Sequence, residues 1–255
     1  MKNLSIVIVL VFCLLQLNIN LFIDKNILNA VSADTDLNPG KNVPIIDRNI
    51  PTNIETATFA MGWFWGPDSL FGVLPGVIRT RVGYAGGEKI NPTYYNLGKY
   101  SETIQIDYNP DKISYTDLLQ LFWSNHNCRL KSASRQYMSI IFYHNNKQQE
   151  SAIQSLQEQE KKLNAELVTE INPLTSFYLA ENYHQKYRLQ QSGALRDRFM
   201  DIYPNFIDFI NSTAVARVNG FLSGHGTCEQ LKKEIDTYGL TEPLKKFLLD
   251  RVCKL

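Results

Sequence analysis

Three cysteines in the second half of the chain are the residues best suited to redox chemistry. Cys128, Cys228 and Cys253 follow a fourth, Cys13, which lies within an apolar N-terminal run. A thiolate is a strong nucleophile, and two thiols can join as a disulfide. The odd number of thiols beyond the N-terminal run predicts one disulfide and one free thiol in an oxidising compartment.

The histidines and the glycine-rich stretch do not predict a metal or a nucleotide site. The histidines show no metal-binding spacing among themselves or with cysteine; they are His126, His144, His184 and His225. Residues 83–87 are rich in glycine but lack the spacing and the following helix of a phosphate-binding loop. We therefore expect no bound metal and no bound nucleotide.

The segment 60–66, Ala-Met-Gly-Trp-Phe-Trp-Gly, is the other distinctive stretch. A short strand pattern precedes it, and a glycine flanks the three adjacent aromatic residues on each side. Glycine adopts backbone conformations that other residues reach only at a cost, which predicts a sharp turn between a strand and a helix. Taken alone, Trp63, Phe64 and Trp65 are explained as a buried aromatic cluster, because such side chains bury large apolar areas.

The order of motifs over residues 56–192 carries a resemblance to a known family. Residues 62–66 resemble the Gly-Cys-Phe-Trp-Gly signature of the A-type peptide methionine sulfoxide reductases. The resemblance continues, in the family's order, through residues 74–77, 82–87, 91–94, 101–103, 122–126, 136–137, 177–178 and 180–185. The resemblance implies an α+β fold, a two-layer α/β sandwich with its active site at the surface. It also implies reduction of methionine-S-sulfoxide in proteins to methionine, by thioredoxin or another dithiol and without a bound cofactor.

Reduction of a sulfoxide needs a nucleophile for the electrophilic sulfur and a proton for the departing oxygen. In the family these are the signature cysteine and a glutamate, and the glutamate corresponds to Glu102. A carboxylic acid kept protonated by burial suits that task. The resemblance further implies that the hydroxyls of Tyr94 and Tyr137 hydrogen-bond the sulfoxide oxygen. Phe64 and Trp65 would form an apolar cradle for the substrate's methyl group.

His184 lies in a stretch that the family places near the substrate cleft. Its neighbours in sequence are Glu181, Asn182, Tyr183 and Gln185. We expect the imidazole to make an orienting hydrogen bond inside the fold rather than to take part in catalysis.

Trp63 stands where the family carries its nucleophilic cysteine. Indole offers no thiolate to attack sulfur, and its bulk is expected to fill the space of the sulfoxide. Three explanations stay open. The chain is a degenerate family member that binds methionine-containing or oxidised peptides without turnover; or Trp63 is a misread cysteine or selenocysteine codon; or Cys128 substitutes as the nucleophile.

Cys228 and Cys253 lie where many relatives carry recycling cysteines. Such a thiol reduces the oxidised nucleophile by thiol–disulfide exchange. Without a cysteine at position 63 there is no oxidised nucleophile for these thiols to reduce. We favour the alternative that a Cys228–Cys253 bridge staples two terminal helices of a secreted protein.

The N-terminus predicts a secretory signal. Lys2 precedes an apolar run over residues 4–15, and residues 31–33 supply small side chains for cleavage after Ala33. The distance from the run to that site is long, so an uncleaved membrane anchor is the alternative. Cleavage would leave 24 basic and 24 acidic side chains, a balance that favours neither nucleic acid nor stable membrane association. We predict a secreted or secretory-pathway protein with an N-glycosylation sequon at residues 211–213.

Hydrophobic periodicity predicts alternating strands and helices, which favours an α+β or α/β sandwich. We expect strands over residues 58–61, 77–84, 103–108, 136–143 and 167–171. We expect helices after Ser114, over residues 145–163, after Thr227 and from Glu242. We divide the 255 residues into a signal peptide (1–33), an N-terminal arm (34–55), a reductase-like domain (56–193) and a helical C-terminal extension (194–255).

Overall fold

The computed structural model describes residues 43–254 of the chain. The predicted signal peptide, and its alternative as an uncleaved anchor, lie outside these residues. The chain from Asn42 onward forms one compact unit. None of the helices over residues 43–254 is long and apolar enough to cross a membrane.

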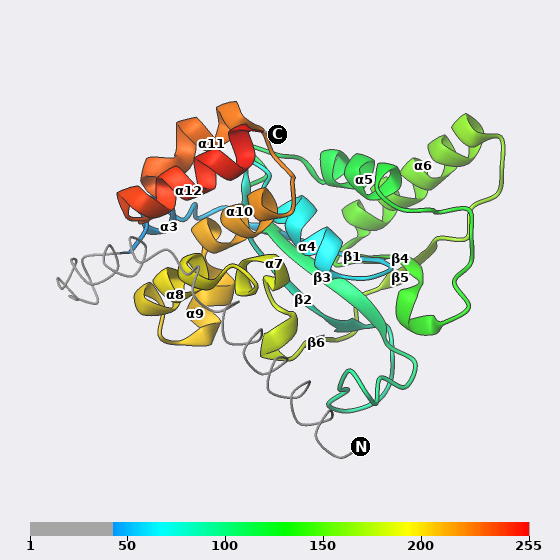
Figure 1. Cartoon of the computed structure of the whole chain (residues 1–255). Coiled ribbons are helices and arrows are strands. Elements are labelled where there is room, and N and C mark those ends of the chain that lie inside the picture. Colours follow the sequence, from blue (N-terminus) through cyan, green and yellow to red (C-terminus); the bar gives the residue numbers. More distant parts are fainter. Residues whose placement is uncertain (1–42, 255) are drawn as a thin grey trace, which may run out of the picture. The chain divides into compact units, whose positions relative to one another are not determined.

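A six-stranded mixed sheet forms the centre of the fold (Figure 1). Its strands are β1 (Glu55–Met61), β2 (Val77–Ala85), β3 (Ser101–Tyr108), β4 (Ser139–Tyr143), β5 (Glu170–Pro173) and β6 (Phe177–Leu179). They lie in the order β5-β4-β1-β3-β2-β6. Only the β4–β5 pair is parallel within this sheet. The central position of β3 buries all eight of its residues.

Three helices before residue 180 pack on the sheet: α4 (Trp65–Gly72), α5 (Tyr115–Ser124) and α6 (Asn146–Leu163). The 3-10 turn η2 (Arg135–Tyr137) lies against β3, whereas Ile46 of the short helix α3 (Ile45–Arg48) packs in the second hydrophobic cluster described below. Alternate residues of a strand point to opposite faces, so Phe59, Val82 and Ile104 share the helix-covered face. The predicted capping box is confirmed, because Ser114 and Asp117 exchange side-chain and backbone hydrogen bonds at the start of α5.

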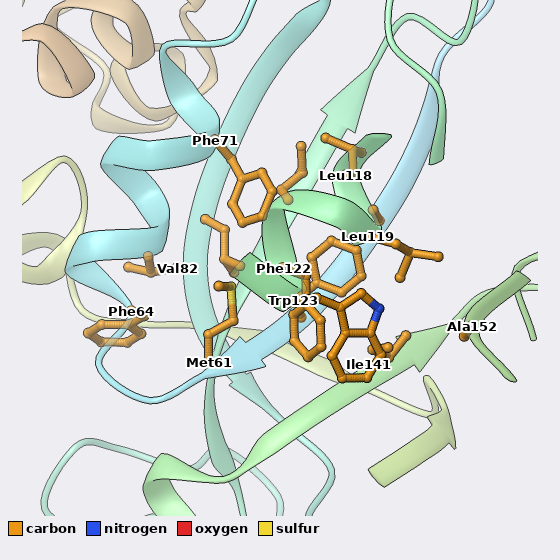
Figure 2. Close-up of a cluster of buried hydrophobic side chains, with 14 of the residues drawn as sticks. Met61, Phe64, Phe71, Val82, Leu118, Leu119, Phe122, Trp123, Ile141 and Ala152 are labelled. Carbon is orange, nitrogen blue, oxygen red and sulfur yellow. The ribbon is translucent and has the colours of Figure 1, made fainter. Parts of the chain in front are cut away.

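The main hydrophobic core lies between these helices and the sheet. Figure 2 shows side chains from several elements converging there, among them Met61, Phe71 and Trp123. Phe64, from the loop that joins β1 to α4, is buried in the same cluster. The aromatic loop is therefore rooted in the core, and its position is fixed by packing.

The remaining helices build a second hydrophobic cluster beside α4 and β2. They are α7 (Tyr187–Gln190), α8 (Gly193–Ile202), α9 (Phe206–Asn211), α10 (Thr213–Leu222), α11 (Cys228–Glu234), η4 (Ile235–Thr237) and α12 (Glu242–Cys253). The 3-10 turn η3 (Asn182–His184) precedes them, and its His184 packs instead against Phe64 and Trp65. Helix α10 is buried throughout and lies close against α4. A side chain at Gly220 would come within 2.5 Å of Val73 and 2.6 Å of the Ser69 carbonyl oxygen. The domain boundary at residue 194 stays a prediction.

The strands predicted over residues 58–61, 77–84 and 103–108 are present and longer, as β1, β2 and β3, and the other two predicted strands begin later than expected. The segment 136–143 begins as a strand only at Ser139, because residues Arg135–Tyr137 form η2. The strand expected over residues 167–171 begins at Glu170 and continues to Pro173. Pro173 is tolerated because it ends β5 at the edge of the sheet, where an amide donor is not needed.

A fully buried ion pair joins α4, β2 and the turn before α7. The Lys186 ammonium donates to Asp68 Oδ1 at 2.7 Å and to the Thr80 hydroxyl at 2.9 Å. The Lys186 backbone N–H donates to Asp68 Oδ2 at 2.9 Å, and the Thr80 hydroxyl donates to Asp68 Oδ1 at 2.6 Å. All three side chains are buried. Each charge therefore depends on the other for its stability inside the protein.

We expect Lys186→Met to lower the free energy of unfolding by about 3–5 kcal/mol, because it leaves the buried Asp68 carboxylate without its cation. Urea unfolding of the purified chain measures this loss. The matched control is Lys147→Met, since Lys147 is exposed and should change stability by less than about 0.5 kcal/mol. A Lys186→Met loss no larger than that of the control would contradict the assignment.

The predicted disulfide is present, between Cys228 at the start of α11 and Cys253 at the end of α12. The two positions are 25 residues apart. Closing a loop of this size restricts the unfolded chain more than the folded one.

We expect the double variant Cys228→Ser/Cys253→Ser to be less stable than the unaltered chain by about 3–4 kcal/mol. Thermal unfolding with and without dithiothreitol measures the effect. The reductant should destabilise the unaltered chain and leave the double variant unchanged. Equal sensitivity of both proteins to the reductant would show that the bridge does not contribute.

Candidate functional site

The turn between β1 and α4 presents the aromatic segment to one end of the sheet. Gly62 has a φ of +83°, and no atom lies within 4 Å of a Cβ built there. The backbone conformation rather than the available space therefore requires glycine. Trp63 and Phe64 follow, and α4 begins at Trp65. The predicted strand-to-helix turn is confirmed.

The residues predicted to form the site surround one cavity of about 180 Å³. Residues from five separate segments meet here: the β1–α4 loop, the start of α4, the loop before β3, β3 itself and η2. The lining residues are Trp63, Phe64, Trp65, Tyr94, Glu102 and Tyr137. Aromatic rings supply most of the wall, and one carboxyl group supplies the ionisable function.

Glu102 is the buried acid of this cavity, with 3% of its surface exposed. It is the second residue of β3 and pairs with Tyr84 across the sheet. Its Oε2 accepts the Phe64 backbone N–H at 3.1 Å, and its Oε1 accepts Gln136 Nε2 at 2.8 Å. Burial raises the pKa of Glu102, and these two hydrogen bonds offset the rise only in part. Glu102 is therefore suited to carrying a proton at higher pH than a solvated glutamate.

The two tyrosines bring hydroxyl groups to the cavity. Burial, aided by the Tyr94 hydroxyl and the charge of Glu102, raises the pKa of Tyr137 to about 12. The Tyr137 hydroxyl is therefore protonated and able to donate a hydrogen bond at neutral pH. Glu181 fixes the loop that carries Tyr94, because its carboxylate accepts the Tyr94 backbone N–H at 3.0 Å and the Tyr84 hydroxyl at 2.7 Å.

Trp63 lies at the rim of the cavity with 67% of its surface exposed. Its ring is edge-on to Tyr137, with the centroids 6.4 Å apart. The expectation that the indole fills the substrate space is therefore wrong. The walls beside it are held by the core, and the indole projects toward solvent instead of displacing them.

His184 is buried behind three of the aromatic walls. Its ring centroid is 4.7 Å from that of Tyr94, 5.0 Å from Phe64 and 5.8 Å from Trp65. The Trp65 indole N–H donates to His184 Nδ1 at 3.2 Å, which agrees with the expected orienting hydrogen bond. Burial lowers the pKa of His184, so its ring is neutral. Tyr187 stacks on a face of the Trp65 ring, with the ring centroids 3.9 Å apart.

The cysteines of the described chain lie away from the cavity lining. Cys128 is a free thiol with 5% of its surface exposed, packed in the main core. Cys228 and Cys253 are bonded to each other in α11 and α12. Across residues 43–254, no thiol lines the cavity. The same residues contain no group of three histidine, cysteine or acidic side chains placed to hold a metal ion.

Several supporting residues carried no role in the sequence analysis. Gln136 holds Glu102, and Glu181 holds the Tyr94 loop. Both lie in stretches that resemble the family, and that resemblance was the one sign in the sequence of their importance. Their partners could not be inferred from it, because these lie at least 34 residues away in sequence. Lys186, two residues after His184, anchors the turn that places the imidazole.

We expect Glu102→Gln to become more stable relative to the unaltered chain as the pH rises from about 4 to about 8. A carboxyl whose pKa is raised by folding loses stability as the pH increases from its ordinary value of 4.5 through its folded value. Glutamine does not ionise and has no such loss. The Gln136 amide can rotate by half a turn, so that its carbonyl oxygen accepts a hydrogen bond from the new amide. Urea unfolding across this range measures the difference. A difference independent of pH, as expected for the exposed control Glu166→Gln, would show that Glu102 has an ordinary pKa.

Comparisons with known proteins agree with this geometry. A family model described as peptide methionine sulfoxide reductase matches residues 55–214. Peptide methionine sulfoxide reductase of Drosophila melanogaster is 43% identical over 206 residues, which cover 80% of this chain and 82% of the fly protein. Peptide methionine sulfoxide reductase A5 of Oryza sativa subsp. japonica is 37% identical over 191 residues, 71% of this chain and 74% of the rice protein.

Solved structures confirm the predicted α+β fold class. Mxr1 from Saccharomyces cerevisiae in its reduced form matches 58% of this chain and 91% of its own, with a TM-score of 0.53 and 26% identity. Methionine sulfoxide reductase A of Corynebacterium diphtheriae matches 56% of this chain and 77% of its own, with a TM-score of 0.52 and 27% identity. On the match of the family model and the coverage of these relatives, the chain belongs to the peptide methionine sulfoxide reductase family.

Proposed function

We propose that the chain as written binds methionine sulfoxide side chains of oxidised proteins and does not reduce them. The observation that carries this proposal is an open cavity that combines hydrogen-bond donors with aromatic walls, while position 63 holds an indole. The relatives carry the name of reductases. With tryptophan at position 63, the chain keeps the groups that bind a sulfoxide and lacks the group that would reduce it.

The cavity suits each part of a methyl sulfoxide. The sulfoxide oxygen is a hydrogen-bond acceptor, and protonated Glu102 and the hydroxyls of Tyr94 and Tyr137 are donors at the cavity wall. The methyl group requires an apolar surface, which Phe64 and Trp65 provide. Because Glu102 is buried, its proton is retained to higher pH than in a solvated glutamate.

Turnover needs a thiolate within reach of the sulfur, and the lining residues include none. Indole nitrogen is a hydrogen-bond donor without a free lone pair for attack. Cys128 does not serve in its place, because its thiol is packed in the core. The proposal therefore assigns no chemical step to the chain as written.

A second candidate is reductase activity with cysteine or selenocysteine at position 63 in the natural protein. The exposure of Trp63 favours it, since a smaller side chain would fit this position without repacking the core. A thiolate there would attack the sulfoxide sulfur while Glu102 protonates the sulfoxide oxygen; this oxygen then passes as hydroxyl from the substrate sulfur to the cysteine sulfur, which gives methionine and a sulfenic acid. Thioredoxin or another dithiol would then reduce the sulfenic acid and release water.

Secretion is the remaining part of the proposal. It is supported by the character of residues 1–33 and by the Cys228–Cys253 bridge, because disulfides persist mainly in oxidising compartments. A reductase in such a compartment would need a thioredoxin-like reductant supplied there.

We expect the chain as written to bind a peptide containing methionine-S-sulfoxide and to show no turnover with dithiothreitol. Trp63→Cys should reduce the same peptide at a rate about a thousandfold or more above that background, because it restores the nucleophile. Binding is measured by calorimetry and turnover by mass spectrometry of the peptide. Trp63→Ala is the control, since it removes the indole without adding a thiol.

Turnover by the chain as written would overturn the proposal, and Cys128→Ser would then test the remaining thiol. Failure of both proteins to bind the peptide would reject sulfoxide recognition. The mass of the peptide that spans residue 63, isolated from the natural source, decides between tryptophan, cysteine and selenocysteine.

A further inference from the structure

The composition of the cavity differs from that of an ordinary apolar pocket. Five of its six lining residues are aromatic, and the sixth is an acid. The faces of aromatic rings carry negative electrostatic potential, which attracts cations within about 6 Å. Aromatic residues that line one cavity are the composition of sites that recognise quaternary ammonium groups, and here a carboxyl group lines the same cavity.

Glu102 has no cationic partner in the described part of the chain. Its carboxylate accepts hydrogen bonds from the Phe64 N–H and the Gln136 amide, and none of the ion pairs over residues 43–254 includes it. When Glu102 is ionised, the cavity therefore holds a buried carboxylate without a counter-charge. Such a group is costly unless a cation joins it. A positively charged ligand would supply the missing charge.

Trp63 adds the ring type that interacts most strongly with cations. Its exposed indole lies edge-on to Tyr137 at the rim, so a ligand entering the cavity would contact it. Phe64, Trp65 and Tyr94 are held in place by His184 behind them. Rigid walls favour binding, because little side-chain entropy is lost when a ligand enters.

We infer that this cavity binds a methylated cation, a trimethylammonium or methylsulfonium group on a flexible chain, with Trp63 and Glu102 as its two decisive residues. The inference rests on the proposed function only in requiring the same open cavity. The two ligands need opposite states of Glu102: a sulfoxide uses the acid as a donor, and a cation uses the carboxylate.

The other ionisable groups around Glu102 do not supply a cation. Burial raises the pKa of both Tyr84 on β2 and Tyr137, so these two phenols are neutral at neutral pH. Burial lowers the pKa of His184, which is therefore neutral as well. Glu181 is ionised, since hydrogen bonds from Tyr84 and Tyr94 lower its pKa despite partial burial. Glu181 adds negative potential near the cavity, which favours a cation further.

We expect choline to bind at least about tenfold more tightly than dimethylbutanol, its neutral isostere with carbon in place of nitrogen. Two of the three tryptophans line the cavity, so tryptophan fluorescence reports occupancy. Affinity for choline should increase as the pH rises through the pKa of Glu102. Affinity for the sulfoxide peptide, measured in the same samples, should decrease over that range.

Variants separate the contributions of charge and ring. Glu102→Gln should abolish the preference for choline and its pH dependence, whereas the exposed control Glu166→Gln should retain both. Trp63→Leu should weaken choline binding about tenfold. It should have less effect on binding of the sulfoxide peptide, because the sulfoxide oxygen accepts hydrogen bonds from Glu102 and the two tyrosines rather than from Trp63. Trp65 remains in this variant, so tryptophan fluorescence still reports binding. A peptide with trimethyllysine, compared with free choline, distinguishes a protein-borne group from a small metabolite.

Equal affinity for choline and its isostere would overturn this inference. If the sulfoxide peptide still binds, the proposed function stands alone. Choline binding without sulfoxide binding would instead reject the proposed function and retain the cation site. Absence of binding by all probes, with the protein folded by circular dichroism, would reject both.

Discussion

The buried pair of Asp68 and Lys186 is the interaction on which the site depends. Asp68 belongs to α4, whose first residue is the cavity wall Trp65. Lys186 follows His184, the residue that supports three aromatic walls. The pair therefore fixes the position of the wall relative to its support, although Asp68 and Lys186 are 118 residues apart in sequence. Thr80 extends the same contact to the sheet.

The side chain of residue 63 does not contribute to these supporting contacts. The protein places its hydrogen-bonding groups on β3, η2 and the loop before β3, and holds its aromatic walls from behind. Residue 63 lies at the rim and faces solvent. A change at this position alters the chemistry without disturbing the core. This arrangement makes tryptophan at position 63 compatible with both the family's fold and an open cavity.

The sequence predicted the elements of the fold better than the contacts of the site. Alternating residues predicted β3, and Ser114 with Asp117 predicted the start of α5, because these signals are local. The resemblance predicted Glu102, Tyr94 and Tyr137 around one cavity. It did not predict the exposure of Trp63. That property depends on walls built from distant segments, which no local pattern in the sequence encodes.

The sequon at residues 211–213 spans the junction of α9 and α10, where folding conceals it. Thr213 is 4% exposed, and its hydroxyl donates to the Ile78 carbonyl oxygen. Ser212 caps α10 and donates to Asp47 Oδ2 at 2.7 Å. Because Ser212 and Thr213 are buried once α10 has packed, this segment is accessible in full to a modifying enzyme only before that. A sugar on Asn211 would therefore be a permanent record that the chain entered the secretory pathway while still unfolded.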